Sequence, residues 1–202
     1  MNNREMLYRG LSCAAWGYLF LNFDFNLGRI SILPRFVGFL FLLCAINSLF
    51  KERDDLLLLR PICIFFAAYY AVDWGLSFVG RGLDLQIVFL DLLLVAAQLY
   101  FHFQFLTDIA AVAENCPKDG EKFAARLRHC RTIYTLLSTA VALTGMIPSL
   151  IRANYGKIYS GTQKDILVLL GLLEGVTAVV IIVTLFGLKR CFQRGKWEGE
   201  IF

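Results

Sequence analysis

Six apolar stretches dominate this 202-residue sequence, and no long polar block separates them. They cover approximately residues 5–23, 34–50, 56–79, 84–107, 130–151 and 165–187. A helix needs about 20 mostly apolar residues to cross a bilayer, and each stretch is close to that length. The chain is 58% hydrophobic and 18% charged, whereas soluble domains average roughly 25% charged residues. We therefore predict one all-α integral membrane domain, residues 1–202, with six transmembrane helices.

Two other membrane-related interpretations fit less well. A transmembrane β-barrel would show apolar residues at alternate positions, whereas Val179–Phe186 is apolar at consecutive positions except for Thr184. The basic start followed by an apolar run is also typical of a signal peptide. The small residues Cys13, Ala14 and Ala15 lie too early in that run for a cleavage site, so we expect a retained first span.

Basic residues are unevenly distributed between the two sides of the predicted bundle. Of the 20 Lys and Arg residues, 14 fall in the N-terminus, the second and fourth connections and the C-terminal tail. Because short cytoplasmic loops are enriched in Lys and Arg, both termini should be cytoplasmic. The net charge of +4 then reflects orientation in a lipid bilayer, and we expect no nucleic-acid partner.

The cysteines agree with that orientation. Three lie in predicted spans and three on the predicted cytoplasmic side: Cys13, Cys44 and Cys63, then Cys116, Cys130 and Cys191. Thiols kept on a reducing side predict no disulfides. Because no Cys-x-x-Cys motif occurs, we expect no zinc or redox site and no cofactor.

Three acidic residues lie inside predicted spans, where ionisable groups are costly and suggest a function. Asp73 and Asp91 are nine residues before and after Gly82, in a tight turn that makes the third and fourth spans a hairpin. Glu174 is nine residues into the last span. At about 1.5 Å per residue, all three lie roughly 10–14 Å below the outer surface.

Further polar residues share helix faces with these acids. Asp84, Asp91, Gln98 and His102 are spaced 7, 7 and 4 residues apart, which forms one stripe on a helix. The predicted ion, proton or substrate site in the outer half of the bundle consists of Asp73, Asp91, Glu174, Gln98, His102 and Tyr70.

Two interpretations of the acids stay open. Neighbouring carboxylates cannot all remain ionised unless a cation binds, so the group could serve protons, a metal ion or a cationic substrate. Alternatively, each protonated carboxyl hydrogen-bonds a neighbouring helix and has only a structural role. His102 taken alone is typical of a packed or interfacial histidine.

Two segments are candidate contact surfaces. Glu114–Arg131 mixes basic and apolar residues, which predicts a cytoplasmic extension of the fifth span that touches anionic headgroups or docks a membrane-protein partner. Gly171 and Gly175 bracket Glu174, and small residues four apart allow another helix to approach closely.

The sequence contains no motif of a known catalytic site. Gly-x-Ser-x-Gly, His-Glu-x-x-His and the P-loop are all absent. We predict no enzyme activity, and a transporter or solute- or ion-binding membrane subunit fits best. The alternative is a non-catalytic accessory, scaffold or sensor subunit of a membrane complex, and an intramembrane enzyme fits less well.

Residues 25–46, FNLGRISILPRFVGFLFLLCAI, resemble a group of uncharacterised multi-span membrane proteins from Gram-positive bacteria. In that group a Leu-Pro-Asp-Phe-Ile-Gly-Tyr stretch opens the second span. The match comprises Leu33, Pro34, Phe36 and Gly38, while Arg35 replaces Asp and Phe39 replaces Tyr. The resemblance implies a multi-pass protein of a bacterial cell membrane and transfers no activity. Because this element faces outward, Arg29 or Arg35 is a candidate counter-ion for Asp24 or for an acid below it. The alternative is a plain interfacial loop.

Overall fold

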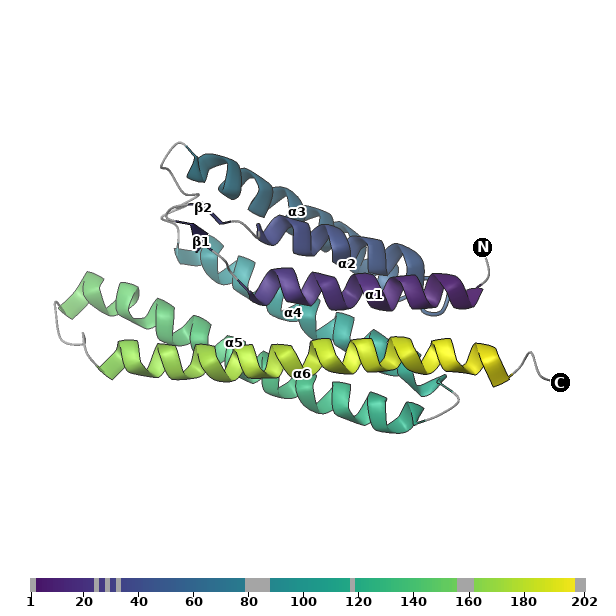
Figure 1. Ribbon diagram of the computed structural model, residues 1–202. Coiled ribbons are helices and arrows are strands. Elements are labelled where there is room, and N and C mark those ends of the chain that lie inside the picture. The colour runs from purple at the N-terminus through teal and green to yellow at the C-terminus, as the bar shows by residue number, and fades with distance from the viewer. Residues whose placement is uncertain are drawn as a thin grey trace.

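The computed structural model is a bundle of six helices with a small β-hairpin after the first helix (Figure 1). It describes residues 3–23, 26–27, 30–31, 34–78, 88–116, 119–155 and 162–198. The elements are α1 (Asn3–Asn22), β1 (Asn26–Leu27), β2 (Ile30–Ser31), α2 (Arg35–Leu49), α3 (Leu56–Ser77), α4 (Val88–Glu114), α5 (Gly120–Tyr155) and α6 (Thr162–Glu198). Successive helices alternate in direction, so the start of α1 and the end of α6 lie at the same end of the bundle.

The predicted all-helical class is confirmed, with the short antiparallel pair of β1 and β2 as an unexpected addition. Three helices in the described part of the chain are long and apolar enough to cross a membrane: Leu56–Ser77, Leu90–Glu114 and Lys164–Gln193. α2 is apolar but has 15 residues, which extend about 22 Å against a hydrocarbon core of about 30 Å. The last three helices are longer than predicted because charged and polar turns continue the helix beyond the apolar stretch.

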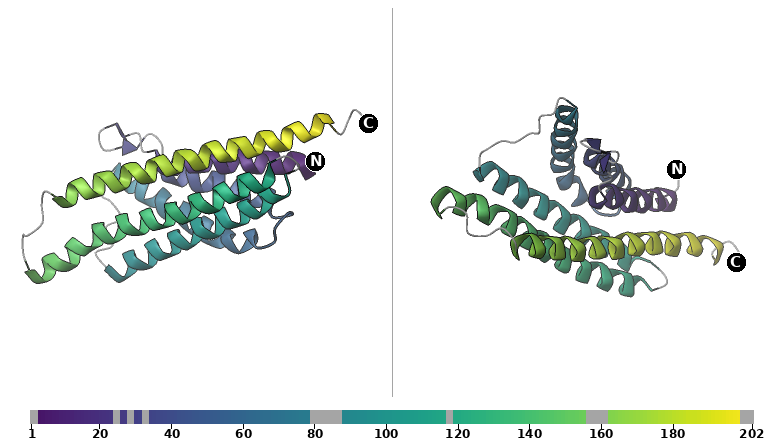
Figure 2. Two further views of the ribbon diagram at one scale, coloured as in Figure 1. Left: turned by 90° about the horizontal axis from the view of Figure 1, so that it is seen from below. Right: turned by 60° about the vertical axis from the view of Figure 1, so that its left-hand side comes forward.

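The helices form two three-helix units. In the first unit α2 packs between α1 and α3, and in the second α5 packs between α4 and α6. The contact of α1 with α6 joins the two units, whereas α3 barely contacts α4. Figure 2 (right) shows α3 standing away from α4. We call this loose contact the α3–α4 interface, and it is where the predicted acids of those two helices lie.

Glycines allow α1 and α2 to approach closely. A Cβ atom at Gly38 would lie 3.0 Å from the backbone oxygen of Gly17, and one at Gly17 would lie 2.7 Å from Leu42. By contrast, a Cβ at Gly171 or Gly175 would meet nothing within 4 Å. The predicted close approach at Gly171 and Gly175 is therefore not made by any described helix of this chain.

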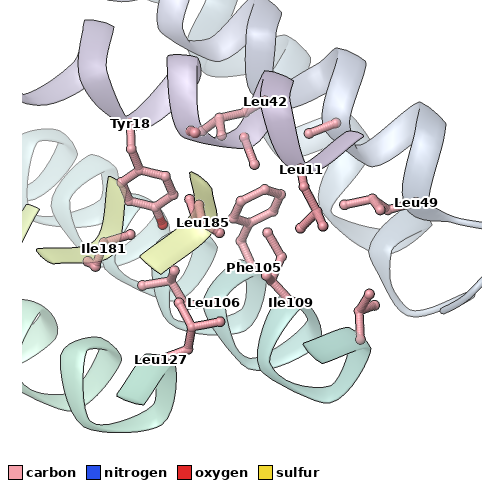
Figure 3. Close-up of a cluster of buried hydrophobic side chains, with 14 of the residues drawn as sticks. Leu11, Tyr18, Leu42, Leu49, Phe105, Leu106, Ile109, Leu127, Ile181 and Leu185 are labelled. Carbon is pink, nitrogen blue, oxygen red and sulfur yellow. The ribbon is translucent and has the colours of Figure 1, made fainter. Parts of the chain in front are cut away.

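Large apolar side chains from several helices fill the centre of the bundle (Figure 3). Tyr18 from α1 and Phe105 from α4 are fully buried there, as are Ile181 and Leu185 from α6. The surface of α6 is also apolar, since Val168, Leu172, Val176 and Val183 are exposed. Apolar side chains on both the inside and the outside of a helix are expected where its outer face contacts lipid.

The prediction that the chain has no disulfide is wrong. Cys116, just after α4, is bonded to Cys191 in α6 across 75 residues, with Cα atoms 6.6 Å apart. That separation falls in the normal range for disulfides. No sequence pattern indicates this pair, because only the packing of the helices brings the end of α4 close to α6. The remaining described cysteines, Cys13, Cys44, Cys63 and Cys130, are free thiols.

Candidate functional site

Two of the predicted acids lie across the α3–α4 interface. The phenol of Tyr69 in α3 is within electrostatic reach of both Asp73 in α3 and Asp91 in α4. Both carboxylates are partly exposed. The arrangement agrees with their equal separation from Gly82, although residues 79–87, including Asp84, lie outside the described residues. A shared tyrosine thus brings the acids of two helices into one neighbourhood.

The third acid lies on the other side of the bundle. Glu174 in α6 accepts a hydrogen bond from the hydroxyl of Ser138 in α5. The hydroxyl of Tyr134, one helical turn before Ser138, is also within electrostatic reach of Glu174. Tyr134 donates a hydrogen bond of 3.1 Å to Oδ1 of Asn22 at the end of α1. Glu174 is therefore part of a polar group that links α6, α5 and α1.

Arg35, the first residue of α2, lies between these two neighbourhoods. Its guanidinium hydrogen-bonds the hydroxyl of Tyr70, which is also within electrostatic reach of Asp73. Arg35 is within electrostatic reach of Tyr134 on the opposite side as well. The sequence pointed to Arg35 only as a candidate counter-ion, and the start of α2 places it among the polar residues. Three carboxylates and one guanidinium leave a net charge of −2 when all are ionised.

Gln98 connects the two helices of the α3–α4 interface. The hydroxyl of Tyr70 donates a hydrogen bond of 3.1 Å to its side-chain oxygen Oε1. Tyr70 also stacks on Phe39 of α2, with ring centroids 5.5 Å apart. Because contacts across this interface are few, the Tyr70–Gln98 hydrogen bond is one of the specific links between α3 and α4.

His102 lies one turn further along α4 and is enclosed by aromatic rings. Only 3% of its surface is exposed, and its Nδ1 lies 3.3 Å from the hydroxyl of Tyr18. The rings of Phe101, Tyr18 and Tyr134 have centroids 5.4 to 5.6 Å from that of His102. Its second ring nitrogen, Nε2, has no hydrogen-bond partner. His102 is thus a packed residue at the inner limit of the polar region.

Replacing His102 tests this pairing. We expect His102→Leu to lower the unfolding free energy by about 1–3 kcal/mol, because it leaves the buried hydroxyl of Tyr18 without a partner. Adding Tyr18→Phe should restore part of the loss, since the orphaned hydroxyl is then removed as well. Thermal unfolding of the detergent-solubilised protein measures both changes. If the double variant were as unstable as the sum of the two single variants, the hydrogen bond would have no role in stability.

The polar stripe predicted on the fourth span does not continue along α4 beyond His102. The next positions on the same face of α4 are Phe105 and Ile109, both fully buried in the apolar core. Asp73, Asp91, Gln98 and Glu174 are partly exposed, whereas His102 and the core residues that follow it on α4 are buried. The polar stripe of α4 therefore ends at a buried apolar core.

One buried acid was missed by the sequence analysis. Asp108 in α4 is 1% exposed, and its Oδ1 accepts a hydrogen bond of 3.0 Å from Gln104 while Oδ2 has no partner. The fourth span was predicted to end at residue 107, which placed Asp108 in a connection. The apolar run Ile109–Ala113 that follows was the available signal that the helix continues.

The basic segment between α4 and α5 is helical from Gly120, as predicted, and several of its cations have partners. Arg128 pairs with Glu114, and Arg131 donates a hydrogen bond of 2.9 Å to Thr107. Lys122 pairs with Asp119 at 2.7 Å, and this hydrogen bond raises the pKa of Lys122. The extension of α5 therefore presents a mixed-charge surface.

The described residues contain no group of three or more His, Cys, Asp or Glu side chains that could hold a metal ion. Of the predicted site residues, Asp73, Asp91, Tyr70 and Gln98 lie together at the α3–α4 interface. Glu174 reaches the same region through Arg35 and Tyr134. No protein-family model, curated protein or solved structure matches this chain.

Proposed function

We propose that this protein is a transporter or solute-binding membrane subunit that takes up a small organic cation in the outer half of its bundle. The observation that carries the proposal is the position of Asp73 and Asp91 on opposite sides of the loose α3–α4 interface. A cation bound there contacts both helices and so favours one separation of α3 and α4 over another. A ligand shifts a conformational equilibrium only through such a difference in contacts.

The charges favour a cationic solute. Arg35 can offset one carboxylate, and the acids of the α3–α4 interface, Asp73 and Asp91, together carry more negative charge than this single guanidinium balances when they are ionised. Such an excess of carboxylates attracts a cation. Partly exposed acids above an apolar core are suited to a ligand that arrives from one side. This polarity supports binding in the outer half, with the side beyond His102 closed in this conformation.

The aromatic residues favour an organic cation over a metal ion. Asp73 has three aromatic neighbours in the sequence of α3, which are Tyr69, Tyr70 and Trp74. The ring centroids of Tyr69 and Tyr70 are 5.3 Å apart. Ammonium groups bind the faces of aromatic rings as well as carboxylates. A metal ion would instead require several oxygen or nitrogen ligands in one cluster. The described residues contain no such cluster of three or more His, Cys, Asp or Glu side chains.

The proposed topology has six spans with both termini in the cytoplasm of a bacterial cell. Three helices already satisfy the length and apolarity of a span. Of the others, α1 and α2 pack in sequence between α6 and α3, and α5 packs between α4 and α6. This lengthwise packing against candidate spans supports a place for α1, α2 and α5 in the same membrane layer. The excess of basic residues at the end holding the termini supports a cytoplasmic location for that end.

Binding of organic cations by the purified full-length protein tests the function. Primary, guanidinium and quaternary ammonium compounds would be titrated separately while tryptophan fluorescence and thermal stability are recorded. We expect one class to bind, and Asp91→Asn to weaken it at least about tenfold, which corresponds to about 1.4 kcal/mol. Asp165→Asn, an exposed acid in α6, is the matched control and should bind normally. Unchanged affinity in Asp91→Asn, or no binding of any class, contradicts the proposal.

The alternative is an accessory or scaffold subunit of a membrane complex, and one observation favours it. The face of α6 around Gly171 and Gly175 leaves space in which a helix of another protein would fit. The Glu114–Arg131 segment would be a second contact for such a partner. Loss of a co-purifying membrane protein in Gly175→Leu, with cation binding absent from the unmodified chain, would favour this alternative.

A further inference from the structure

Two free thiols meet where α1 crosses α2. The sulfur of Cys13 in α1 lies 3.2 Å from the sulfur of Cys44 in α2. Cys13 lies between Gly10 and Gly17 along α1, and a Cβ at either glycine would be 2.7 Å from a leucine of α2. Because residues three and four apart share a helix face, the glycines that bring the helices together also bring the two thiols into contact.

The pair differs from the other free cysteines in its exposure. Cys13 and Cys44 are each partly exposed, whereas Cys63 and Cys130 are buried. Cys63 also has a separate role, since its thiol donates a hydrogen bond to the backbone oxygen of Phe39. Among the free cysteines described, only Cys13 and Cys44 are both partly exposed and in contact through their sulfur atoms.

The existing disulfide lies at a similar level of the bundle. Lys189 in α6, two residues before Cys191, donates a hydrogen bond of 3.1 Å to Ser12, the neighbour of Cys13. The contact between Lys189 and Ser12 thus connects the stretch of α6 that carries Cys191 with the stretch of α1 that carries Cys13. In a cytoplasmic location, disulfides are usually transient and respond to the redox state.

We propose that Cys13 and Cys44 are a redox modification site that forms a reversible α1–α2 disulfide when the protein meets a hydroperoxide. One thiol loses its proton and attacks the O–O bond, which forms a sulfenic acid and releases water or an alcohol. The second thiol then attacks the sulfenic sulfur, and a water molecule leaves as the S–S bond forms. The two thiols lose two electrons and two protons, and the peroxide is reduced. An added dithiol reverses the reaction by thiol–disulfide exchange.

The cross-link would act on helices that carry site residues. α1 ends at Asn22, which accepts the hydrogen bond of Tyr134, and α2 begins at Arg35. Joining Cys13 to Cys44 fixes the contact between these two helices. The modification is independent of the proposed cation binding, since it requires only the two sulfur atoms and a peroxide.

Thiol counting on the full-length protein in membranes tests the proposal. After treatment with hydrogen peroxide, the protein is denatured without reduction and tagged with a polyethylene glycol maleimide. The untreated chain should carry four tags, and the treated chain two. A dithiol should restore only those two tags under conditions that leave Cys116–Cys191 oxidised. Two matched variants start with three tags each. Peroxide should not remove a pair of tags from Cys44→Ser, because Cys13 then has no partner. It should reduce Cys63→Ser from three tags to one, because Cys13 and Cys44 are both present.

The identity of the bond is established by mass spectrometry of non-reduced tryptic peptides. Trypsin places Cys13 in residues 10–29 and Cys44 in residues 36–51, and these peptides should be joined only after peroxide treatment. Retention of four tags by the treated wild-type chain overturns the proposal. So does a linkage of either peptide to a different cysteine, or the loss of two tags by peroxide-treated Cys44→Ser.

Discussion

Phe39→Ala is expected to lower the unfolding free energy by about 3–5 kcal/mol, the usual cost of removing a buried aromatic ring. Phe39 is fully buried at the junction of the two three-helix units. Its ring stacks on Phe66 of α3 at 5.3 Å and on Tyr70 at 5.5 Å, and it lies 5.8 Å from Phe101 of α4. The substitution leaves a cavity that all these neighbours line, and it removes one support of the α3–α4 interface.

Thermal and denaturant unfolding in detergent would measure the loss for Phe39→Ala. The matched control is Phe65→Ala, because Phe65 is in α3 but half exposed. Detergent or lipid replaces an exposed ring without leaving a cavity, so the control should change stability little. Since Tyr70 rests on Phe39, we also expect weaker cation binding by Phe39→Ala. Equal losses in the two variants would mean that the aromatic junction does not hold the units together.

Gly38→Leu is expected to destabilise the protein by about 3 kcal/mol, at the upper end of the usual cost of overpacking. A Cβ at this position would lie 2.8 Å from Leu21 and 3.0 Å from the backbone oxygen of Gly17. The side chain of Leu21 can rotate away from the new side chain. The backbone oxygen of Gly17 can move away only if α1 and α2 separate. Their separation would also break the contact between Cys13 and Cys44.

The control for Gly38→Leu is Gly75→Leu, where a Cβ would meet nothing within 4 Å. Leucine is a better helix former than glycine, so the control should be neutral or slightly stabilising. Unfolding measurements test both variants, and peroxide cross-linking in Gly38→Leu reports the helix separation directly. A stable Gly38→Leu variant that still forms the Cys13–Cys44 bond would show that the close approach is not required.

Helix content was predictable from the sequence because it depends on local patterns. Long apolar runs, bounded by Pro34, by charged turns and by glycine-rich connections, placed all six helices near their observed positions. The ends of α4, α5 and α6 were less accurate, because helices continue through polar turns where hydropathy falls. Asp108 was missed for this reason, since the predicted span ended just before it.

The candidate site was predictable only in part. Counting residues from the turn at Gly82 placed Asp73 and Asp91 together, because antiparallel neighbours in a hairpin have matching depth. The same counting predicted for Glu174 a depth similar to that of Asp73 and Asp91. It did not identify the partners of Glu174, which are Ser138 and Tyr134, or the position of Arg35 near Tyr134. These contacts join residues more than 30 positions apart, and hydropathy carries no information about which helix faces meet.

The amino-acid sequence by itself determined an apolar, helical chain with three acids inside its apolar stretches and most basic residues in the N-terminus, alternate connections and the tail. Only the tertiary structure decided how the six helices are arranged: α1 packs on α6, while α3 and α4 hardly touch. That arrangement paired Cys116 with Cys191, overturning the expectation of free thiols, and brought Cys13 against Cys44. The physical reason is that periodicity and charge act along each helix, whereas pairing depends on the fit of side chains between helices, as at Gly17 and Gly38.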